Sequence, residues 1–227
     1  MLKPAIDIFD EIGGCVIFVG EVMRTAWRSP CSFESICRQI WKVTIQSLPT
    51  TAMAGFFVGA IMTVQFTMQI KGFGALGFLG GLSTSATVRE IGPLLIAFLL
   101  SGKVGAFTSA ELGTMRVTEQ IDALRALSTN PFKYLVAPRI LAGIIMMPFL
   151  VLIADIIGVL GGYLVSVYSL GFSPGPYVAN TFKFLETIDV VSGLVKAGFF
   201  GFIIAVMGCY FGYNSQRGAE GDRKSVV

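Results

Sequence analysis

Four long apolar stretches stand out in the pattern of hydrophobic and polar positions along the chain. They cover residues 50–70, about 91–112, 140–168 and 190–213. A helix needs about 20 mostly apolar residues to cross the roughly 30 Å core of a bilayer. The first stretch contains no charged residue, and the third and fourth contain one each, Asp155 and Lys196. The pattern therefore predicts an all-α, polytopic membrane protein with four visible transmembrane helices.

The N-terminal segment has a different pattern. Residues 5–27 mix apolar positions with acidic and basic ones, which makes the segment too polar for a comfortable span. This composition is typical of an amphipathic helix that lies in the membrane interface, with Trp27 and Arg28 near the lipid headgroups. A soluble helix packed on the cytoplasmic side is the alternative. Acidic residues come early and no basic region precedes an apolar one, so no secretory signal peptide is expected.

Lysine and arginine positions predict the orientation. Twelve lie on one side of the four predicted spans, and three, Lys71, Arg89 and Lys183, lie on the other. Basic residues accumulate on the cytoplasmic side of a membrane, so the N-terminus, the 113–139 loop and the tail are predicted to be cytoplasmic. The whole chain is expected to form a single domain, which consists of an interfacial or cytoplasmic segment 1–49, a membrane bundle 50–213 and a cytoplasmic tail 214–227.

The composition excludes several classes of function. Only 14% of the residues are charged, against about 25% in a soluble domain, which argues against a soluble enzyme. Histidine is absent, and the four cysteines form no C-x-x-C pair, so histidine-based catalysis and the common metal motifs are excluded. A net charge of +3 is too small to suggest nucleic acid. Gly102-Lys103 lacks the rest of a phosphate loop, so ATP would have to bind a separate subunit.

Residues 72–81 connect the first two spans and are glycine-rich and apolar. They form either a flexible turn or a segment that dips back into the bilayer against protein.

Charged residues in and beside the spans predict a cluster in the outer half of the membrane. Arg89 and Glu90 are adjacent at the start of the second span, and Lys196 lies about six residues inside the fourth. Asp189 is about two helical turns before Lys196, on roughly the same face. A lysine inside a membrane needs a carboxylate or a water-filled cavity. We expect these four residues to act in gating, helix registration or headgroup contact; simple snorkelling at the interface is the alternative.

The loop after the second span predicts a short helix. Thr118 is placed to cap its N-terminus, with Glu119 and Asp122 in the first turn. Apolar residues follow at i, i+3 and i+6, namely Ile121, Leu124 and Leu127. Asn130-Pro131 is expected to end the helix. Such a helix either docks into a groove of a soluble partner or lies flat on the membrane and caps the bundle.

Several motifs together resemble one family. They are R-E-I-G-P at 89–93, A-E-L-G-T-M-R-V-T-E-Q-I-D-A-L at 110–124, N-P at 130–131, P-R at 138–139, G-G at 161–162, G-Y-N at 212–214 and G-A-E-G at 218–221. In this order they resemble the MlaE/YrbE family. Its members are the permease subunits of Mce-associated ABC transporters, which move lipids between the membranes of double-membraned bacteria.

The resemblance implies an arrangement of subunits. It implies a homodimer in the inner membrane, an ABC ATPase docked on the helix after the second span, and a Mce-domain protein on the periplasmic side. Phospholipid or another apolar lipid would occupy an outward-facing pocket at the dimer interface. ATP and magnesium would bind the ATPase, with no cofactor and no catalytic or metal site in this chain.

The same resemblance implies roles for individual residues. The matching ATPase-coupling positions are Thr118, Glu119, Gln120, Asp122, Leu124 and Leu127. The matching lipid-pocket positions are Val64, Gln65, Met68 and Gln69. The transmembrane charged positions are Arg89, Glu90, Asp189 and Lys196.

The resemblance implies five spans, but after Gly221 the sequence is D-R-K-S-V-V and no fifth is visible. The chain is therefore expected either to be truncated or altered at its end, or to work with four spans. An incomplete, inactive copy of the permease is therefore one alternative. Another is an ion-coupled secondary transporter that uses Asp155, Glu90 and Lys196, although the inverted repeats usual in that class are not visible. An intramembrane enzyme is the third, and no pair of carboxylates falls within one span to support it.

Overall fold

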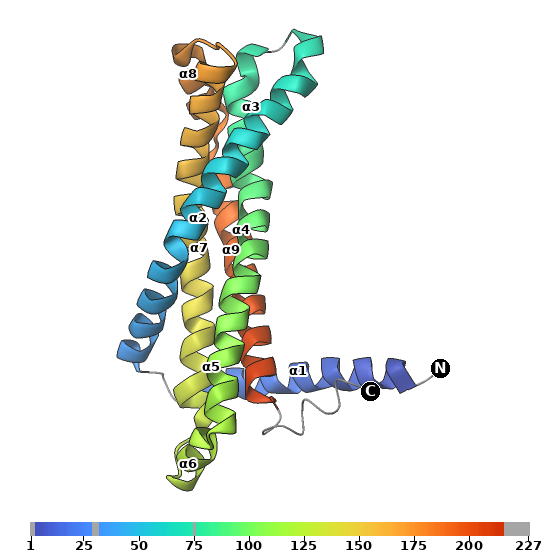
Figure 1. The fold of residues 1–227 in the computed structure, drawn as a ribbon, viewed down its shortest axis with the longest axis vertical. Helices are drawn as coiled ribbons and strands as arrows, with labels where there is room; N and C mark the ends of the chain where they lie inside the picture. The colour runs from blue at the N-terminus through green and yellow to red at the C-terminus, as the bar shows by residue number, and fades with distance from the viewer. Residues whose placement is uncertain (1–2, 29–31, 75, 216–227) are drawn as a thin grey trace. The chain divides into compact units, whose positions relative to one another are not determined.

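The computed structural model describes residues 3–28, 32–74 and 76–215 (Figure 1). Helices make up nearly all of these residues, and no strand occurs among them. The predicted all-α class is therefore confirmed. The chain divides into two compact units, which are described separately. Unit 1 comprises Met1–Trp41, Ser101–Gly143 and Phe202–Val227, and unit 2 comprises Lys42–Leu100 and Ile144–Gly201.

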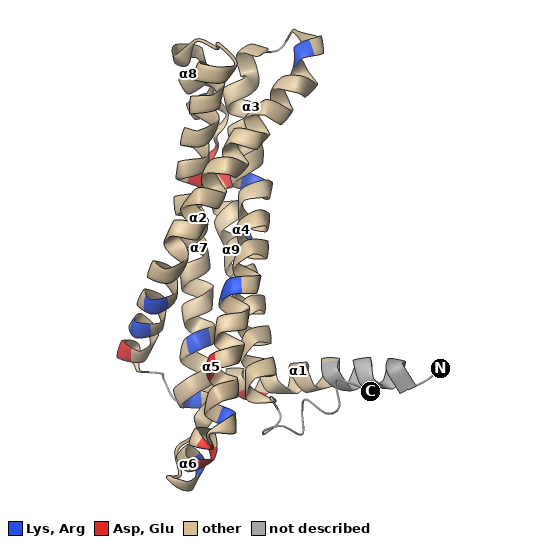
Figure 2. Cartoon of the chain, in the orientation of Figure 1, with Lys and Arg blue, Asp and Glu red and all other residues tan. Residues whose placement is uncertain are grey.

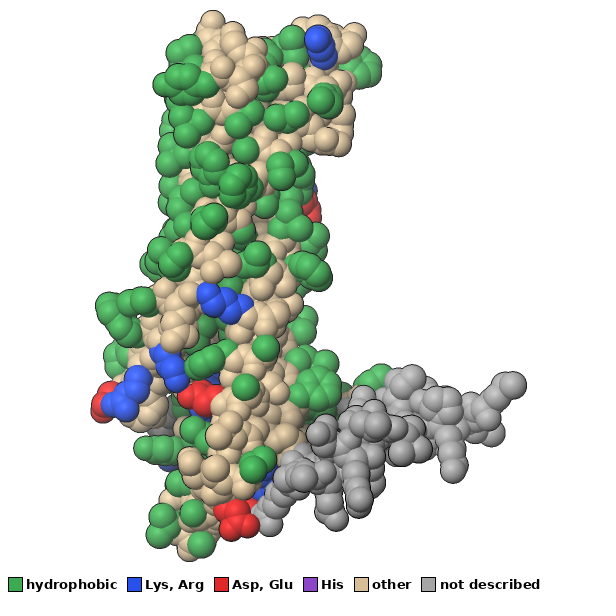
Figure 3. All heavy atoms as spheres, viewed as in Figure 1, with side chains coloured by type: hydrophobic (Ala, Val, Ile, Leu, Met, Phe, Trp, Pro, Cys, Tyr) green, Lys and Arg blue, Asp and Glu red, His purple; other side chains and the backbone are tan. Residues whose placement is uncertain are grey.

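Within the described residues, four helical segments are long and apolar enough to cross a membrane, as predicted. They are Phe33–Phe73, Leu76–Val117, Phe132–Ser169 and Thr187–Tyr213. Each extends beyond the apolar stretch that predicted it, because the helix continues into flanking polar residues. Hydrophobic side chains cover much of the visible face of these helices (Figure 3). Large apolar groups such as Phe98, which is 79% exposed, point outward, as expected where the solvent is lipid rather than water.

Unit 1 contains the N-terminal helix and the loop helix. Its elements are α1 (Lys3–Arg28), the π turn η4 (Ser101–Gly105), α5 (Ala106–Val117), α6 (Gln120–Ala126), the π turn η5 (Phe132–Val136), the start of α7 (Ala137–Leu164) and the end of α9 (Thr187–Tyr213). Within this unit α1 runs sideways from the ends of α5 and α9 (Figure 1). Phe18 and Val22 of α1 are buried, whereas Ile12 and Val16 are exposed. The predicted amphipathic helix is present, and its location in the interface stays a prediction. The side chains of Trp27 and Arg28 lie outside the described ones.

Unit 2 contains most of the first span and the connections at residues 71–86 and 170–186. Its elements are the main part of α2 (Phe33–Ile70), the 3₁₀ turns η1 (Lys71–Phe73) and η2 (Leu76–Phe78), α3 (Leu79–Ala86), the π turn η3 (Thr87–Ile91), α4 (Gly92–Leu100), the rest of α7, the π turn η6 (Val165–Ser169), α8 (Pro174–Phe184) and the start of α9. The glycine-rich segment 72–81 thus leads into a helix. Gly80 and Gly81 pack directly against Tyr177 and Phe184 of α8, so this end of the segment is packed helix and not a flexible turn.

Small residues allow α2 and α7 to pack closely in unit 2. Gly55 and Gly59, one helical turn apart, lie against the backbone of Ala154 and Gly158. A Cβ atom at either glycine would collide with a main-chain carbonyl of α7. Close backbone approach at small residues is a common basis of helix packing in membranes, where no hydrophobic driving force separates helices from lipid. This contact fixes the position of α7 and of Asp155, which α7 carries.

Candidate functional site

Four charged side chains of unit 2 form one network inside the spanning segments. The Nζ atom of Lys196 lies 2.7 Å from Oε1 of Glu90 and donates a hydrogen bond of 3.1 Å to the carbonyl oxygen of Arg89. The guanidinium of Arg89 lies 3.8 Å from Glu90 Oε1 and 3.8 Å from Asp189 Oδ1. Ser85 donates a hydrogen bond of 2.9 Å to Asp189 Oδ2. Charged residues are otherwise sparse along the long helices (Figure 2). The structure brings the four predicted residues together, and their role stays a prediction.

The local backbone explains why these groups meet. Arg89 and Glu90 lie in η3, a π-helical turn, and such turns insert one extra residue into an α-helix, often at functional sites. On the facing helix, Gly193 lies against the carbonyl of Val88, where a Cβ atom would come within 2.5 Å of the oxygen. This glycine therefore lets α9 approach η3 closely. Lys196 follows it by about one helical turn and so reaches Glu90.

The network is buried on one side and open on the other. The side chain of Asp189 is 8% exposed, whereas those of Arg89 and Glu90 are 60% and 61% exposed. A charge inside a membrane is costly unless it is paired or hydrated. Asp189 meets this condition through Arg89 and Ser85. The open edge presents one cationic and one anionic group, which can bind the polar part of a ligand or the matching edge of a second chain.

Asp155, in the middle of α7, is a separate buried carboxylate. The residue is 8% exposed, and its Oδ1 atom has no hydrogen-bond partner in the described part of the chain. That oxygen lies against Gly92, which follows η3, so that a Cβ atom at residue 92 would collide with it. The alternative hypothesis of an ion-coupled transporter used Asp155 together with Glu90 and Lys196. Among the described ion pairs, Glu90 and Lys196 bind each other and Asp155 takes part in none.

The loop helix of unit 1 begins later than predicted. Thr118 does not cap it: its hydroxyl donates a hydrogen bond of 2.8 Å to the carbonyl of Thr114, within the last turn of α5. A threonine hydroxyl competes in this way for a carbonyl one turn back. Glu119 then takes a left-handed conformation with φ of 59°, and α6 starts at Gln120. The capping prediction was therefore wrong.

The helix also ends earlier than predicted, at Ala126. The N–H of Ser128 bonds the carbonyl of Arg125 at 2.9 Å, and the N–H of Thr129 bonds that of Leu124 at 3.0 Å. These two bonds form a Schellman motif, with Ser128 at the left-handed position that is usually glycine; its φ is 57°. Asn130 instead begins the next helix, because its Oδ1 accepts a hydrogen bond of 2.9 Å from the N–H of Phe132.

The predicted coupling residues lie on different sides of α6. Ile121 is fully buried, Leu124 is half-buried, and Leu127 is 75% exposed. The three do not form one continuous apolar face, because the short helix ends before Leu127. Asp122 is tied internally, at 3.1 Å from Arg116 and 3.4 Å from Arg125. The outward-facing members of the predicted set are Thr118, Glu119, Gln120 and Leu127.

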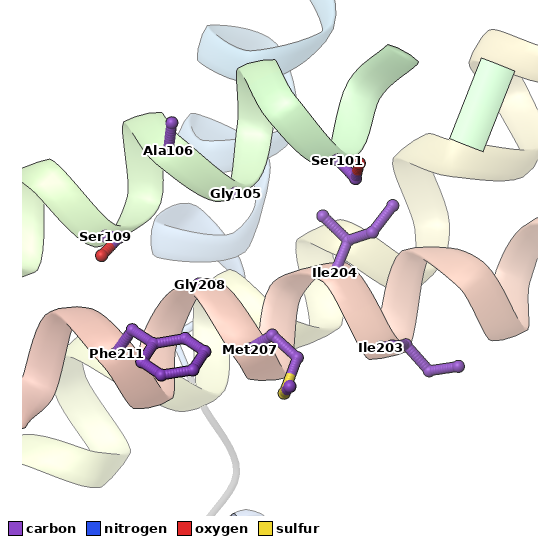
Figure 4. A pocket seen from close by; sticks show the side chains of 9 residues that line it. All are labelled: Ser101, Gly105, Ala106, Ser109, Ile203, Ile204, Met207, Gly208 and Phe211. Atoms are coloured by element: carbon purple, nitrogen blue, oxygen red, sulfur yellow. The ribbon is translucent and has the colours of Figure 1, made fainter. Parts of the chain in front are cut away.

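An apolar groove of about 430 Å³ runs between η4–α5 and the end of α9 in unit 1. Small residues such as Gly105 and Ala106 form one wall, and Ile203, Met207 and Phe211 line the other (Figure 4). The groove exists because the α5 side lacks bulky side chains at these positions. Its chemistry suits an apolar group, since only Ser101 and Ser109 contribute hydroxyls.

Comparison with known proteins identifies the family. A family model described as Permease MlaE matches residues 36–226. The chain belongs to this family. It is 47% identical over 219 residues to a probable ABC transporter permease protein of Rickettsia conorii, a match that covers 96% of this chain and 85% of the relative. It is 32% identical to a probable ABC transporter permease protein of Synechocystis, with 96% and 83% covered. It is also 31% identical to the chloroplast protein Trigalactosyldiacylglycerol 1 of Arabidopsis thaliana, with 93% and 60% covered.

These matches make the protein an ABC transporter permease of the MlaE family, a multi-pass membrane subunit. An ABC permease works with an ATPase subunit, so an ATPase partner follows from the family. The predicted lipid-pocket residues of this MlaE permease lie along α2: Val64 is half-buried, and Gln65, Met68 and Gln69 are exposed. They do not line the groove between α5 and α9, and their role stays a prediction.

Sequence reasoning missed two features of unit 1. One is an ion pair of 2.9 Å between Arg139 Nη2 and Glu111 Oε2, which joins α7 to α5. The other is a cluster of aromatic rings around Phe18. Arg139 and Glu111 could have been paired from the sequence, because each is the charged residue nearest the end of its predicted span that adjoins the 113–139 loop. No comparable signal pointed to the rings, since aromatic residues are frequent throughout this chain.

Proposed function

We propose that this permease moves phospholipid or another apolar lipid between the inner membrane and a periplasmic Mce-domain partner, powered by its ATPase subunit. The observation that carries the proposal is the open edge of the charge network, set among apolar spanning helices. A ligand that suits this edge needs a charged or zwitterionic group attached to a large apolar body, which describes a membrane lipid. The Arabidopsis relative is named after a glycolipid, and this name also supports a lipid substrate.

A homodimer follows from the same edge. Arg89 and Glu90 are more than half exposed within a segment that is apolar enough to span a membrane. Facing lipid tails they would be costly, because a charged group in hydrocarbon loses its hydration. A second copy would cover the edge and enclose a lipid site between the two chains. The exposed residues of α2, which include Met68, would line that site from each copy, since methionine adapts to flexible acyl chains.

The ATPase is proposed to dock on α6, with the N-terminus, α6 and the tail in the cytoplasm, as the distribution of basic residues predicts. ATP and magnesium would bind that subunit. Glu119, Gln120 and Leu127 face outward from unit 1 and are available to a soluble partner. Movement of α6 during the ATPase cycle would open and close the lipid site.

Co-expression with the ATPase and the Mce-domain protein of the same transporter tests the proposal. The 227-residue chain would be affinity-purified, its partners identified, and its bound lipid measured by mass spectrometry. ATP-dependent transfer of labelled phospholipid from proteoliposomes to the Mce-domain protein is expected. A permease that carries no lipid, or transfer driven by an ion gradient without ATP, would contradict the proposal; ion-driven transfer would favour the secondary-transporter alternative built on Asp155.

A further inference from the structure

The buried centre of unit 1 joins the loop helix α6 to the N-terminal helix α1. Arg125 of α6 donates a hydrogen bond from Nη2 to the hydroxyl of Tyr213 at 2.6 Å, across 88 residues of sequence. Tyr213 is the last residue of α9 and is only 7% exposed. A short, charge-assisted hydrogen bond, a class that is stronger than neutral ones, therefore joins α6 to the interior of the unit. The guanidinium of Arg125 also lies over the ring of Tyr213, 5.8 Å from its centroid.

From Tyr213 the contacts continue to α1 through aromatic rings. The ring of Tyr213 lies 5.0 Å from that of Phe132 and 5.9 Å from that of Phe18, between centroids. Phe18 also lies 5.5 Å from Phe132 and 5.6 Å from Tyr210, the latter edge to face. These separations are those of interacting aromatic pairs. Phe18 is 5% exposed, so α1 inserts this one large side chain between η5 and the end of α9.

Two further contacts hold α1 on α9. Gly14 allows the Tyr210 hydroxyl to come so close that a Cβ atom at residue 14 would lie 2.6 Å from it. The Sγ atom of Cys15 lies 3.8 Å from the Sδ atom of Met207. Helix α1 thus packs against the last two turns of α9, the part of that helix whose Tyr213 binds Arg125.

Helix α6 is short and is bounded by a turn at each end. It is seven residues long and lies between two non-glycine residues with left-handed backbone, Glu119 and Ser128. Ile121 is fully buried, and the pair of Asp122 with Arg125 lies within the helix, whereas the pair of Asp122 with Arg116 ties it to the end of α5. A displacement of α6 would therefore act on α5 through Asp122 and on Tyr213 through Arg125.

We infer that Arg125 and Tyr213 are positioning residues that carry movement of α6 to the N-terminal helix α1, through the ring of Phe18. The inference rests on the proposed docking of the ATPase at α6. It gives α1 a function in the transport cycle, because the helix would change its packing with the state of the ATPase. A purely structural role of the ring cluster needs the rings but not the hydroxyl of Tyr213.

Tyr213→Phe removes that hydroxyl and keeps the ring. Tyr134→Phe is the matched control, because it deletes the hydroxyl of an exposed tyrosine in the same unit. Hydrogen exchange would be followed by mass spectrometry on peptides of α6 and of α1 in nanodiscs. In the free permease we expect α6 amides to exchange about fivefold to tenfold faster in Tyr213→Phe, the factor that the loss of one hydrogen bond contributes. Their exchange should be unchanged in Tyr134→Phe.

The second stage adds the ATPase subunit trapped with ATP and vanadate. In the wild-type chain both α6 and α1 should change their exchange. In Tyr213→Phe and in Arg125→Gln the α6 response should remain while at least half of the α1 response is lost, and Tyr134→Phe should respond like the wild type. An α1 response that persists in Tyr213→Phe, or that is absent from the wild type while α6 responds, would overturn the inference. A wild-type α6 that does not respond would instead overturn the proposed docking and, with it, the inference.

Discussion

The Nζ atom of Lys196 is bound twice, to Oε1 of Glu90 at 2.7 Å and to the main-chain oxygen of Arg89 at 3.1 Å. One ammonium group thus neutralises a carboxylate and satisfies a carbonyl of the π turn. Both partners belong to η3, so Lys196 fixes α9 to this turn in register. Unlike an ion pair alone, the arrangement depends on the length of the lysine side chain as well as on its charge.

Lys196→Ala should destabilise the protein and impair transport. The variant leaves Glu90 with only Arg89 at 3.8 Å and leaves the Arg89 carbonyl without this donor. Because these groups are exposed in large part, we expect only a small fall in the free energy of unfolding. Membrane insertion should be unaffected. The measurements are denaturant unfolding in detergent and lipid transfer in proteoliposomes.

Lys183→Ala is the matched control for that substitution. Lys183 is exposed on α8, so its removal changes the net charge equally and should leave stability and transport unchanged. If Lys196→Ala transports lipid at the wild-type rate, the network is incidental to transport. A loss of transport equal in both variants would show that the effect comes from net charge and not from the pairing with Glu90.

Glu119→Lys should uncouple the ATPase. Glu119 is exposed at the start of α6, and the substitution reverses the charge of the proposed docking surface. Its backbone is left-handed, with φ of 59°, which costs glutamate and lysine a similar amount because neither is branched at Cβ, so lysine should not disturb the fold of α6. We expect at least a fivefold loss of ATPase stimulation by the permease, because a reversed charge at an interface costs 1 kcal/mol or more.

The control for Glu119→Lys is Glu186→Lys, an exposed glutamate just after α8, on the predicted opposite side of the membrane. ATPase activity and co-purification would be measured for both variants. Full stimulation by the Glu119→Lys permease would place the docking surface elsewhere. Loss of stimulation in the Glu186→Lys variant as well would indicate a general defect in assembly.

Ser128 offers a test of how tightly α6 is held. Its φ of 57° completes the Schellman motif, and the left-handed region costs a non-glycine residue about 1–2 kcal/mol. Ser128→Gly should be neutral or stabilising by up to about 1 kcal/mol, since relief of this cost is offset by the greater freedom of glycine in the unfolded chain. Ser128→Val should destabilise by about 1–2 kcal/mol, because a β-branched residue is least compatible with this conformation.

Thermal unfolding of the two Ser128 variants, together with proteolysis at the α6 loop, would check this prediction. Val should make the loop more sensitive to protease and Gly should not. Equal stability of the two variants would mean that Ser128 does not adopt its left-handed conformation in the membrane-embedded protein.

The sequence was informative where one physical effect dominates. Uninterrupted apolar stretches predicted the four spanning helices, because a bilayer permits few charges in such a segment. The meeting of Lys196 with Glu90 was predictable for a related reason: a charge within a span needs a partner, and few are available. The boundaries of α6 were not predictable, because the hydroxyl of Thr118 could bond forward as a cap or backward to Thr114, and the two bonds are similar in energy.

Contacts between residues that are far apart in the sequence could not be predicted from it either. The hydrogen bond between Arg125 and Tyr213 joins residues 88 positions apart. Tyr213 lies in the G-Y-N motif at 212–214, but nothing in that motif pairs it with Arg125. The burial of Ile121 but not of Leu127 depends on where α6 ends, which is set by the turn at Ser128. Helical periodicity assigned both to one face because it assumes that the helix continues.

Gly59→Ala should disrupt the packing of the first and third spans. The methyl group would collide with the main-chain carbonyl of Gly158 on α7, and a backbone carbonyl cannot move aside as a flexible side chain can. We expect a loss of about 2–3 kcal/mol in the free energy of unfolding, at the upper end for an added methyl group in a packed interior, with a lower yield of folded protein.

Gly175→Ala in α8, where no atom lies within 4 Å of the added group, should be neutral or slightly stabilising. Unfolding in nanodiscs would compare the two, and because both substitutions add the same methyl group to a helical glycine, any difference reports the space at residue 59 alone. A Gly59→Ala variant as stable as Gly175→Ala would show that α2 and α7 are further apart in the membrane than the close contact of Gly59 with Gly158 requires.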